Sequence, residues 1–307
     1  MSQTVQQDYR LGKFFEKYRN NFPKLLCVNL LFGIPLAVFI GVMVLITYLT
    51  GQLSIYIAAL AIPLLSPFFA ALTYIAKKLT VGQEIHPVQD FKKGIKDNWK
   101  YFLINSILIY IISVGLYITF SFYRIFSDVP MIMAGVIMTT IVALFFLFME
   151  FTIPVMAVSV DLKFMQIIKN SVFLIAVGFA NNIKTLLSLL FVFFILFVLI
   201  QVSVLPVIAI CFLALVTLTL LPVLLVYIVV FNSYQTIEKN IIDPYIQEHG
   251  SPDEKKFDDN NSQTAVFSYD ELERLSKGDP DEYVSLNGRM LKRSTVAKMA
   301  QAHKNDI

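Results

Sequence analysis

The sequence has no charged residue in two long stretches. No Asp, Glu, Lys or Arg lies between Lys24 and Lys77, or between Lys184 and Glu238, and each stretch exceeds 50 residues. One helical crossing of a bilayer needs about 20 apolar residues, so each stretch can hold two crossings. With 57% hydrophobic and 15% charged residues, the chain also carries more apolar surface than a soluble fold of this length buries. These features predict an integral membrane protein.

The residues and motifs of common active sites are also scarce. The two cysteines, Cys27 and Cys211, both fall within apolar segments, so the sequence offers neither a disulfide framework nor metal-ligand spacing. His86, His249 and His303 lie outside the apolar stretches, and no His-Glu-x-x-His, Gly-x-Ser-x-Gly or phosphate-binding glycine loop is present. We therefore expect no catalytic residue, no cofactor and no metal site. A net charge of +3 also gives no reason to expect a nucleic-acid partner.

The apolar runs predict an all-α, polytopic bundle of about six transmembrane helices. In lipid, every backbone N–H and C=O must be paired internally, which leaves helices or a closed barrel. The runs are unbroken, whereas barrel strands alternate between apolar and polar residues. A turn is expected at Thr50, Gly51 and Gln52, another at Gln201, Ser203 and Pro206, and Pro63 and Pro67 should bend the second helix. The predicted spans are residues 25–49, 55–75, 101–122, 131–157, 186–200 and 207–231.

The distribution of Lys and Arg predicts the orientation in the cell membrane. Five lie before the first span, six in residues 76–100 and three in residues 161–184, whereas the opposite loops hold only Arg124. Cytoplasmic loops carry the excess of positive charge. Both termini and both long connections are therefore expected to be cytoplasmic.

Three segments are expected along the chain. Residues 1–24 form a cytoplasmic amphipathic segment, with apolar residues at spacings of three and four, which should lie flat at the membrane surface. Residues 25–235 form the six-helix domain. Residues 236–307 form a polar, largely disordered cytoplasmic tail with short helices, one bearing Leu272 and Leu275 after a capping box at Ser268 and Glu271, and another over residues 294–303.

The connection over residues 77–100 is the most informative polar segment. Pro87 can begin a helix at the cytoplasmic membrane surface. One interpretation is an anchor that binds anionic lipid, and the alternative is a docking element for another protein. On this helix the expected packing face is Val88, Phe91, Ile95 and Trp99, and the expected basic face is Lys92, Lys93 and Lys96.

Few ionisable or carboxamide residues lie in the predicted spans and the turns between them. Within the spans, Glu150 is the only ionisable one, and a carboxylate in hydrocarbon is costly unless it is paired. It therefore has two interpretations: a structural or interfacial residue, or part of an ion or proton pathway. Asn29, Asn105 and Gln201 are expected to form hydrogen bonds between helices.

A weak internal similarity links the two cytoplasmic connections. Residues 97–100, Asp-Asn-Trp-Lys, precede the third span, and residues 181–184, Asn-Asn-Ile-Lys, precede the fifth. Both spans enter the membrane in the same direction. A parallel duplication of a helix, surface segment and helix is one explanation, and the frequency of Asn and Lys at membrane borders is the other.

The order of these features resembles the YesL-like family of bacterial membrane proteins, whose molecular function is unassigned. The resemblance covers most of residues 11–235 and is most distinctive over residues 67–100. It implies an association with carbohydrate import systems of the ATP-binding-cassette type, and no chemistry. The residues that carry it are Asn29-Leu30-Leu31, the run from Ser66 and Pro67 to Lys77-Lys78, Asp90-Phe91, Asn98 and Lys100.

Three functional hypotheses follow. The first is a non-enzymatic accessory subunit that contacts such an importer through its cytoplasmic segments. The second is a small secondary transporter or channel acting alone, with Glu150 as a coupling group. The third is a membrane scaffold or regulator that acts through its tail. Under all three, the lipid bilayer is a partner, and the oligomeric state stays open.

Overall fold

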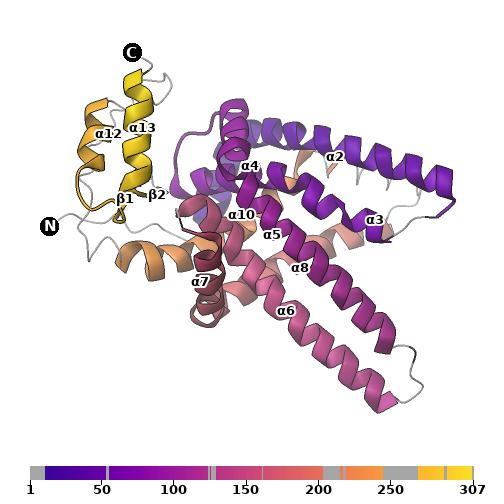
Figure 1. Cartoon of the computed structure of the whole chain (residues 1–307). Coiled ribbons are helices and arrows are strands. Elements are labelled where there is room, and N and C mark those ends of the chain that lie inside the picture. The colour runs from indigo at the N-terminus through magenta and orange to yellow at the C-terminus, as the bar shows by residue number, and fades with distance from the viewer. Residues whose placement is uncertain are drawn as a thin grey trace. The chain divides into compact units, whose positions relative to one another are not determined.

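In a computed structural model, the residues that the structure describes fold almost entirely into helices (Figure 1). The structure describes residues 11–52, 55–123, 125, 129–160, 162–202, 215–216, 219–244, 269–286 and 289–305. Within these residues, six helices are long and apolar enough to cross a membrane: Phe22–Thr50, Ile55–Val81, Pro87–Tyr123, Val129–Ser159, Phe179–Gln201 and Leu221–Ile242. This confirms the all-α, multi-pass fold. The chain divides into two compact units, Met1–Val158 with Phe164–Thr236, and Ser159–Lys163 with Ile237–Ile307.

The first two helices meet at Asn21. Helix α1 (Leu11–Asn20) is followed by α2 (Phe22–Thr50), which has a proline, Pro23, in its first turn, where the missing N–H costs no hydrogen bond. Helix α2 ends at Gly51, whose φ of 70° is left-handed and whose N–H donates to the carbonyl of Thr47 at 2.9 Å. The first span and the turn after it are therefore confirmed.

Helix α1 packs on α10 (Leu221–Ile237) through an aromatic cluster that the sequence analysis did not predict. The ring of Phe14 stacks on Tyr227 with 4.5 Å between centroids and meets Phe231 edge-on at 5.3 Å. Phe14 is buried, whereas Leu11 and Phe15 on the rest of α1 are exposed. Burial in this cluster also raises the pKa of Tyr18 to about 12. One face of helix α1 thus packs against α10, and another face is exposed.

The second span is interrupted and ends later than predicted. It consists of α3 (Ile55–Ala59) and α4 (Ala61–Val81), with a break at Leu60. Pro63 explains the break, because it has no N–H and its ring crowds the carbonyl one turn earlier. The predicted end at residue 75 is wrong, since α4 continues to Val81 and is followed by Gly82, where φ is 82°. Lys77 and Lys78 therefore lie in the helix and not in a loop.

The predicted surface helix and the third span are a single helix. Helix α5 (Pro87–Tyr123) runs for 37 residues without a break, as Figure 1 shows. No proline follows Pro87 within it, so nothing removes a backbone hydrogen bond at the border between its charged and apolar halves. The expectation of a separate helix lying on the membrane surface is therefore wrong.

Helices α4 and α5 cross closely at Gly94. A Cβ atom on Gly94 would lie 2.7 Å from the Cα of Ala71 and 3.1 Å from the Cβ of Tyr74. Asp90, Gly94 and Asn98 follow one another at every fourth residue and are all buried, so they form the contact face of α5. Small residues at such a crossing let two helix backbones approach, which is a common basis of helix association in lipid.

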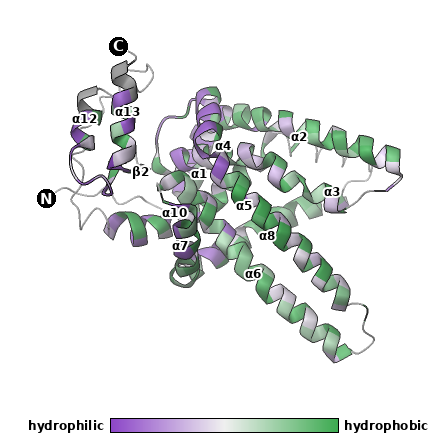
Figure 2. Cartoon of the chain, in the orientation of Figure 1, coloured by the Kyte–Doolittle hydropathy of each residue, from purple (hydrophilic) through white to green (hydrophobic). Residues whose placement is uncertain are grey.

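The fourth and fifth spans are joined by a further helix. Helix α6 (Val129–Ser159) leads to α7 (Phe164–Val177) and α8 (Phe179–Val202), so the fifth span begins earlier than the predicted residue 186 and includes Lys184. The side chain of Asn181 on α8 donates to Thr236 Oγ1 on α10 at 2.8 Å. Figure 2 shows hydrophobic residues along most of α2, α6 and α8.

The sixth span also extends past its predicted end at residue 231. Helix α10 continues into a short π-helical turn, η1 (Glu238–Ile242). The predicted turn residues Ser203 and Pro206 and the predicted start at residue 207 lie outside the described residues.

The C-terminal residues form a small α/β unit. Helix α12 (Tyr269–Ser276), strands β1 (Tyr283–Leu286) and β2 (Arg289–Lys292), and helix α13 (Arg293–Asn305) follow in order, and the strands pair antiparallel with Leu286 opposite Arg289. The two helices lie where short helices were expected, but the hairpin and the core were not predicted. Ser268 lies outside the described residues. The buried core consists of Leu272, Val284, Leu286, Leu291, Val296 and Ala300.

The crossing at Gly94 gives a stability prediction. Gly94→Ala should destabilise the protein by about 1–3 kcal/mol, because the added methyl group meets the backbone of Ala71. The matched control is Gly115→Ala in the same helix, where a Cβ has no neighbour within 4 Å. Thermal unfolding of the detergent-purified variants measures both, and equal melting temperatures would contradict the close crossing.

Candidate docking site at the start of α5

A tight link joins α4 to α5. The N–H of Gly82 donates to the carbonyl of Leu79, and the N–H of Gln83 donates to that of Lys78 at 2.9 Å, which closes the C-terminal turn of α4. In the link, residues 83–86, the side chain of Ile85 is fully buried. The link is therefore packed against the protein at its centre.

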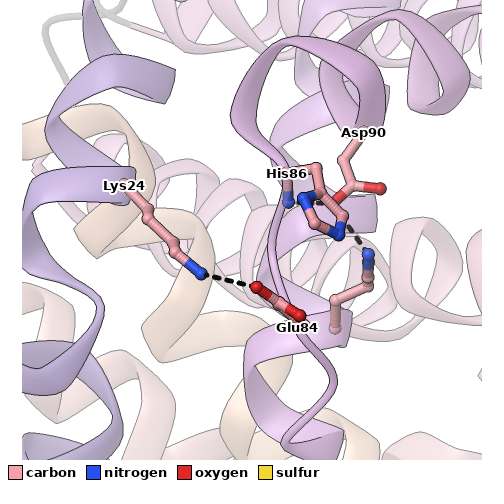
Figure 3. Close-up of polar contacts among 5 residues, drawn as sticks. Lys24, Glu84, His86 and Asp90 are labelled. Atoms are coloured by element: carbon pink, nitrogen blue, oxygen red, sulfur yellow. Dashed lines mark hydrogen bonds and ion pairs between the residues drawn. The ribbon is translucent and has the colours of Figure 1, made fainter. Parts of the chain in front are cut away.

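A buried ion pair fixes the first turn of α5. Lys78 Nζ lies 2.7 Å from Asp90 Oδ2, and both side chains are nearly inaccessible to solvent. The same oxygen accepts the backbone N–H of His86 at 2.8 Å, which would otherwise have no partner at the helix start (Figure 3). Asp90 thus connects the end of α4, the link and α5. A charge-assisted pair of this kind is strong only because both charges are satisfied.

Two further contacts hold the link to the first helices. Lys24 on α2 forms an ion pair of 3.3 Å with Glu84, as Figure 3 shows, and both side chains are exposed. Lys17 on α1 donates to the carbonyl of Thr80 near the end of α4. The link itself therefore contacts α2 through Glu84 and α5 through His86, while α1 contacts the end of α4 just before the link.

The predicted packing face is only partly available. Phe91 is buried, with its ring 6.5 Å from that of Phe68 on α4, so it supports the fold and does not face a partner. Val88 is 48% exposed and Trp99 41% exposed, and Ile95 is half-buried. Lys92, Lys93 and Lys96 are all exposed. We define the docking face as Val88, Ile95 and Trp99 together with these three lysines.

The length of α5 carries part of this face beyond the hydrocarbon. At 1.5 Å per residue, residues 101–123 measure about 35 Å, already enough to cross a core of about 30 Å. Residues 87–100 add about 21 Å on the basic side. The headgroup layer accounts for only about 5–8 Å on each side. A tilt of about 20° shortens the axial length by less than a tenth. With the predicted span beginning at residue 101, we therefore expect the first turns of α5 to project into water.

The residues that resemble the YesL-like pattern fall into two groups. Asp90 and Asn98 are buried in the α4–α5 contact, where Asn98 Nδ2 donates to the carbonyl of Gly94 at 3.1 Å. Pro67 lies half-buried within α4. Lys100 is exposed, and its Nζ lies 5.7 Å from the centroid of the Trp99 ring. Two of these four residues, Asp90 and Asn98, therefore support the crossing rather than an open site.

Asn29 bridges α2 to the start of α10. Its side chain donates to the carbonyl of Thr219 at 2.9 Å and accepts the N–H of Val223 at 2.9 Å. These two backbone groups would bond to each other in a regular helix, and Pro222 lies between them. The carboxamide therefore replaces a missing backbone hydrogen bond. The structure places Asn29 as a contact between helices.

Asn105 and Glu150 form a polar contact between α5 and α6. Asn105 Nδ2 donates to Glu150 Oε2 at 2.8 Å. This contact supports the structural interpretation of Glu150, because a carboxylate within a span needs such a partner. Gln201 lies near the end of α8 with its side chain exposed, so the structure does not place it between helices.

From the sequence, Lys78 was recognised only as part of the YesL-like pattern, and no role was predicted for Glu84 or Gly94. The signal for Gly94 was present, because Asp90, Gly94 and Asn98 recur at every fourth residue and outline one helix face. That face is polar and small, whereas a buried helix face is usually recognised by its apolar residues. The partner of Asp90 had no comparable signal, since Lys78 lies on another helix.

The comparisons with known proteins give no relative. No family model, no curated protein and no solved structure matches the chain. The resemblance to the YesL-like family therefore stays a prediction. In the described part of the chain, no three His, Cys, Asp or Glu residues are placed to hold a metal ion. The chain is a helical, multi-pass membrane protein. The first turn of its helix α5 is held to α4 by the Lys78–Asp90 ion pair.

The buried ion pair gives a second prediction. Asp90→Asn should lower the free energy of unfolding by about 3 kcal/mol, because it leaves the Lys78 ammonium buried without a counter-charge. Adding Lys78→Met should restore part of that loss. The control Glu84→Gln, in an exposed pair, should cost less than about 1 kcal/mol. Thermal unfolding in detergent compares the native chain, the two single variants and the double variant. Similar losses of stability for Asp90→Asn and Glu84→Gln would contradict a larger contribution from the buried pair than from the exposed one.

Proposed function

We propose that this chain is a non-enzymatic membrane protein that binds another membrane protein through the docking face of α5. The observation that carries the proposal is the exposure of Val88 and Trp99 beside exposed lysines on a helix that extends past the hydrocarbon. Apolar side chains that lie together on an exposed helix face often mark a surface that a partner covers. A partner that covers this face would bury them.

Contact with lipid can explain the exposed residues at only one end of the docking face. Trp99 and Lys100 lie near the start of the apolar half of α5, where aromatic and basic residues anchor helices at the interface. Val88 lies about 17 Å farther along the helix axis, beyond the headgroup layer. The part of the face that includes Val88, Lys92 and Lys93 therefore favours a protein.

The tethered link makes the face suitable for binding. The Lys78–Asp90 pair and the Gly94 crossing hold α5 against α4 before any partner arrives. A surface that is already ordered loses little conformational entropy on association. Lys92, Lys93 and Lys96 favour an acidic surface on the partner, which would increase the rate and specificity of binding.

The resemblance to the YesL-like family suggests the partner. It supports a carbohydrate importer of the ATP-binding-cassette type, of which this chain would be an accessory subunit in the cell membrane. The basic residues support a cytoplasmic location for the docking face. The complex would then form on the inner side of the membrane.

Charge reversal tests the proposed docking. The tagged full chain is purified from its native membrane in mild detergent, and the co-eluting proteins are identified. We expect importer subunits with the native chain, and at least a tenfold loss of them with Lys92, Lys93 and Lys96 all changed to Glu, as expected when like charges replace complementary ones.

A matched pair of single changes separates docking from total charge. Lys96→Glu should reduce recovery, whereas Lys169→Glu, an exposed lysine on α7, should not. Failure of the native chain to retain any importer subunit would refute the importer as the partner. Equal recovery with Lys96→Glu and with the native chain would refute the docking face.

The C-terminal unit supports a second candidate function, a scaffold or regulator. Its described residues form a packed core, and Arg293 joins both ends of the unit by donating to Glu282 at 2.6 Å and to the carbonyl of Leu275 at 3.2 Å. A folded unit of this kind can act as a binding module.

Removal of residues 251–307 tests this second candidate. If the unit is the module, its deletion should remove a partner from the purified complex while the membrane helices keep the melting temperature of the full chain. If the α5 face alone is responsible, the truncated chain should retain the same partners.

A further inference from the structure

Helix α8 carries an open groove on its surface. The groove begins near the start of the helix and follows residues spaced three and four apart, so it runs along one helix face. Its lining is apolar except for one ammonium group and one hydroxyl group. The lining residues are Ala180, Ile183, Lys184, Leu187, Ser188 and Phe191.

The apolar part of the groove is open to the membrane. Leu187 is 60% exposed and Phe191 63% exposed, and α8 is long and apolar enough to span. In a bilayer, acyl chains cover such side chains. The groove runs about 10 Å from Lys184 to Phe191, and the apolar face continues toward the other end of α8.

Lys184 is the only charged residue of α8 and is half-buried at its first turns. It forms no ion pair with any residue that the structure describes. The hydroxyl of Ser188 donates to the backbone carbonyl of Lys184 at 2.8 Å, so it is already engaged. The polar end of the groove is therefore a single ammonium group at the level where the helix enters the membrane.

We propose that this groove binds an anionic phospholipid. The phosphate lies against Lys184 Nζ, and one acyl chain lies along Ile183, Leu187 and Phe191. A lysine near the end of a span is stabilised when its ammonium reaches the headgroup layer. A lipid with net negative charge compensates that ammonium, whereas the choline of a zwitterionic lipid opposes it.

Helix α5 provides a natural comparison. Gly94, Asn98 and Lys100 have the same spacing as Gly178, Asn182 and Lys184, and each glycine packs against another helix. Lys100, however, lies beside the indole ring of Trp99, where α8 has Ile183. Lys100 is therefore a matched control, since it is a lysine at the corresponding place whose neighbour is an indole ring.

Tryptophan quenching by brominated lipids tests the site. Trp99 is the only tryptophan, so a full chain with Trp99→Phe and Phe194→Trp carries one reporter, on α8 just past the groove. This protein is reconstituted with mixtures of phosphatidylcholine and phosphatidylglycerol, one of them brominated in its chains. We expect phosphatidylglycerol to be preferred at the reporter by about fivefold, the effect of one lysine near the surface.

Three further variants decide the role of Lys184. Lys184→Gln should abolish the preference, and Lys184→Arg and Lys100→Gln should both keep it. Equal quenching by the two lipids in the reporter protein would overturn the proposal. A preference for phosphatidylglycerol that survives Lys184→Gln would also overturn it, and so would a preference that Lys100→Gln reduces equally. Either result would show that anionic lipid is attracted by all the basic residues on that side of the protein.

Discussion

The crossing of α4 and α5 at Gly94 is the contact on which the proposed docking site depends. Lipid is as apolar as the helices, so helices in a bilayer associate through close packing and hydrogen bonds. Gly94 lets the backbone of α5 reach Ala71, and the Lys78–Asp90 pair joins the same two helices one turn earlier. The outward direction of the docking face follows from these two contacts, since the residues that face α4 determine which residues remain exposed.

Polar side chains have a structural role elsewhere in the membrane part. Asn29 replaces a backbone hydrogen bond beside Pro222, Asn105 pairs with Glu150, and Asn181 bonds to Thr236. Each contact joins residues that lie at least 45 positions apart in the sequence. Few such residues occur within the spans, and a hydrogen bond between helices satisfies groups that lipid cannot. These contacts explain how a protein with largely lipid-exposed helices keeps one arrangement.

The sequence predicted the presence of the spans better than their ends. Absence of charge located the apolar segments, because charge in the hydrocarbon is costly. The ends were misplaced at Lys77, Lys78 and Lys184, since helical hydrogen bonds continue into water where charge costs nothing. The surface helix was wrong for the same reason.

The hairpin was missed although Asn287-Gly288 is a strong turn signal, because the polar tail was judged by composition. The pairing of Lys78 with Asp90 depends on tertiary structure, which local pattern does not contain.

The central claim is that the charged and apolar halves of α5 form one continuous helix. A distance measured by electron paramagnetic resonance between spin labels tests it most directly. The labels are placed at Val88→Cys and Ile118→Cys, both exposed, in a chain with Cys27 and Cys211 replaced by Ala and reconstituted in lipid. A continuous helix predicts a backbone separation of about 45 Å. A separation of about 32 Å, as expected for a helix that lies on the surface and turns near Tyr101, would contradict the account.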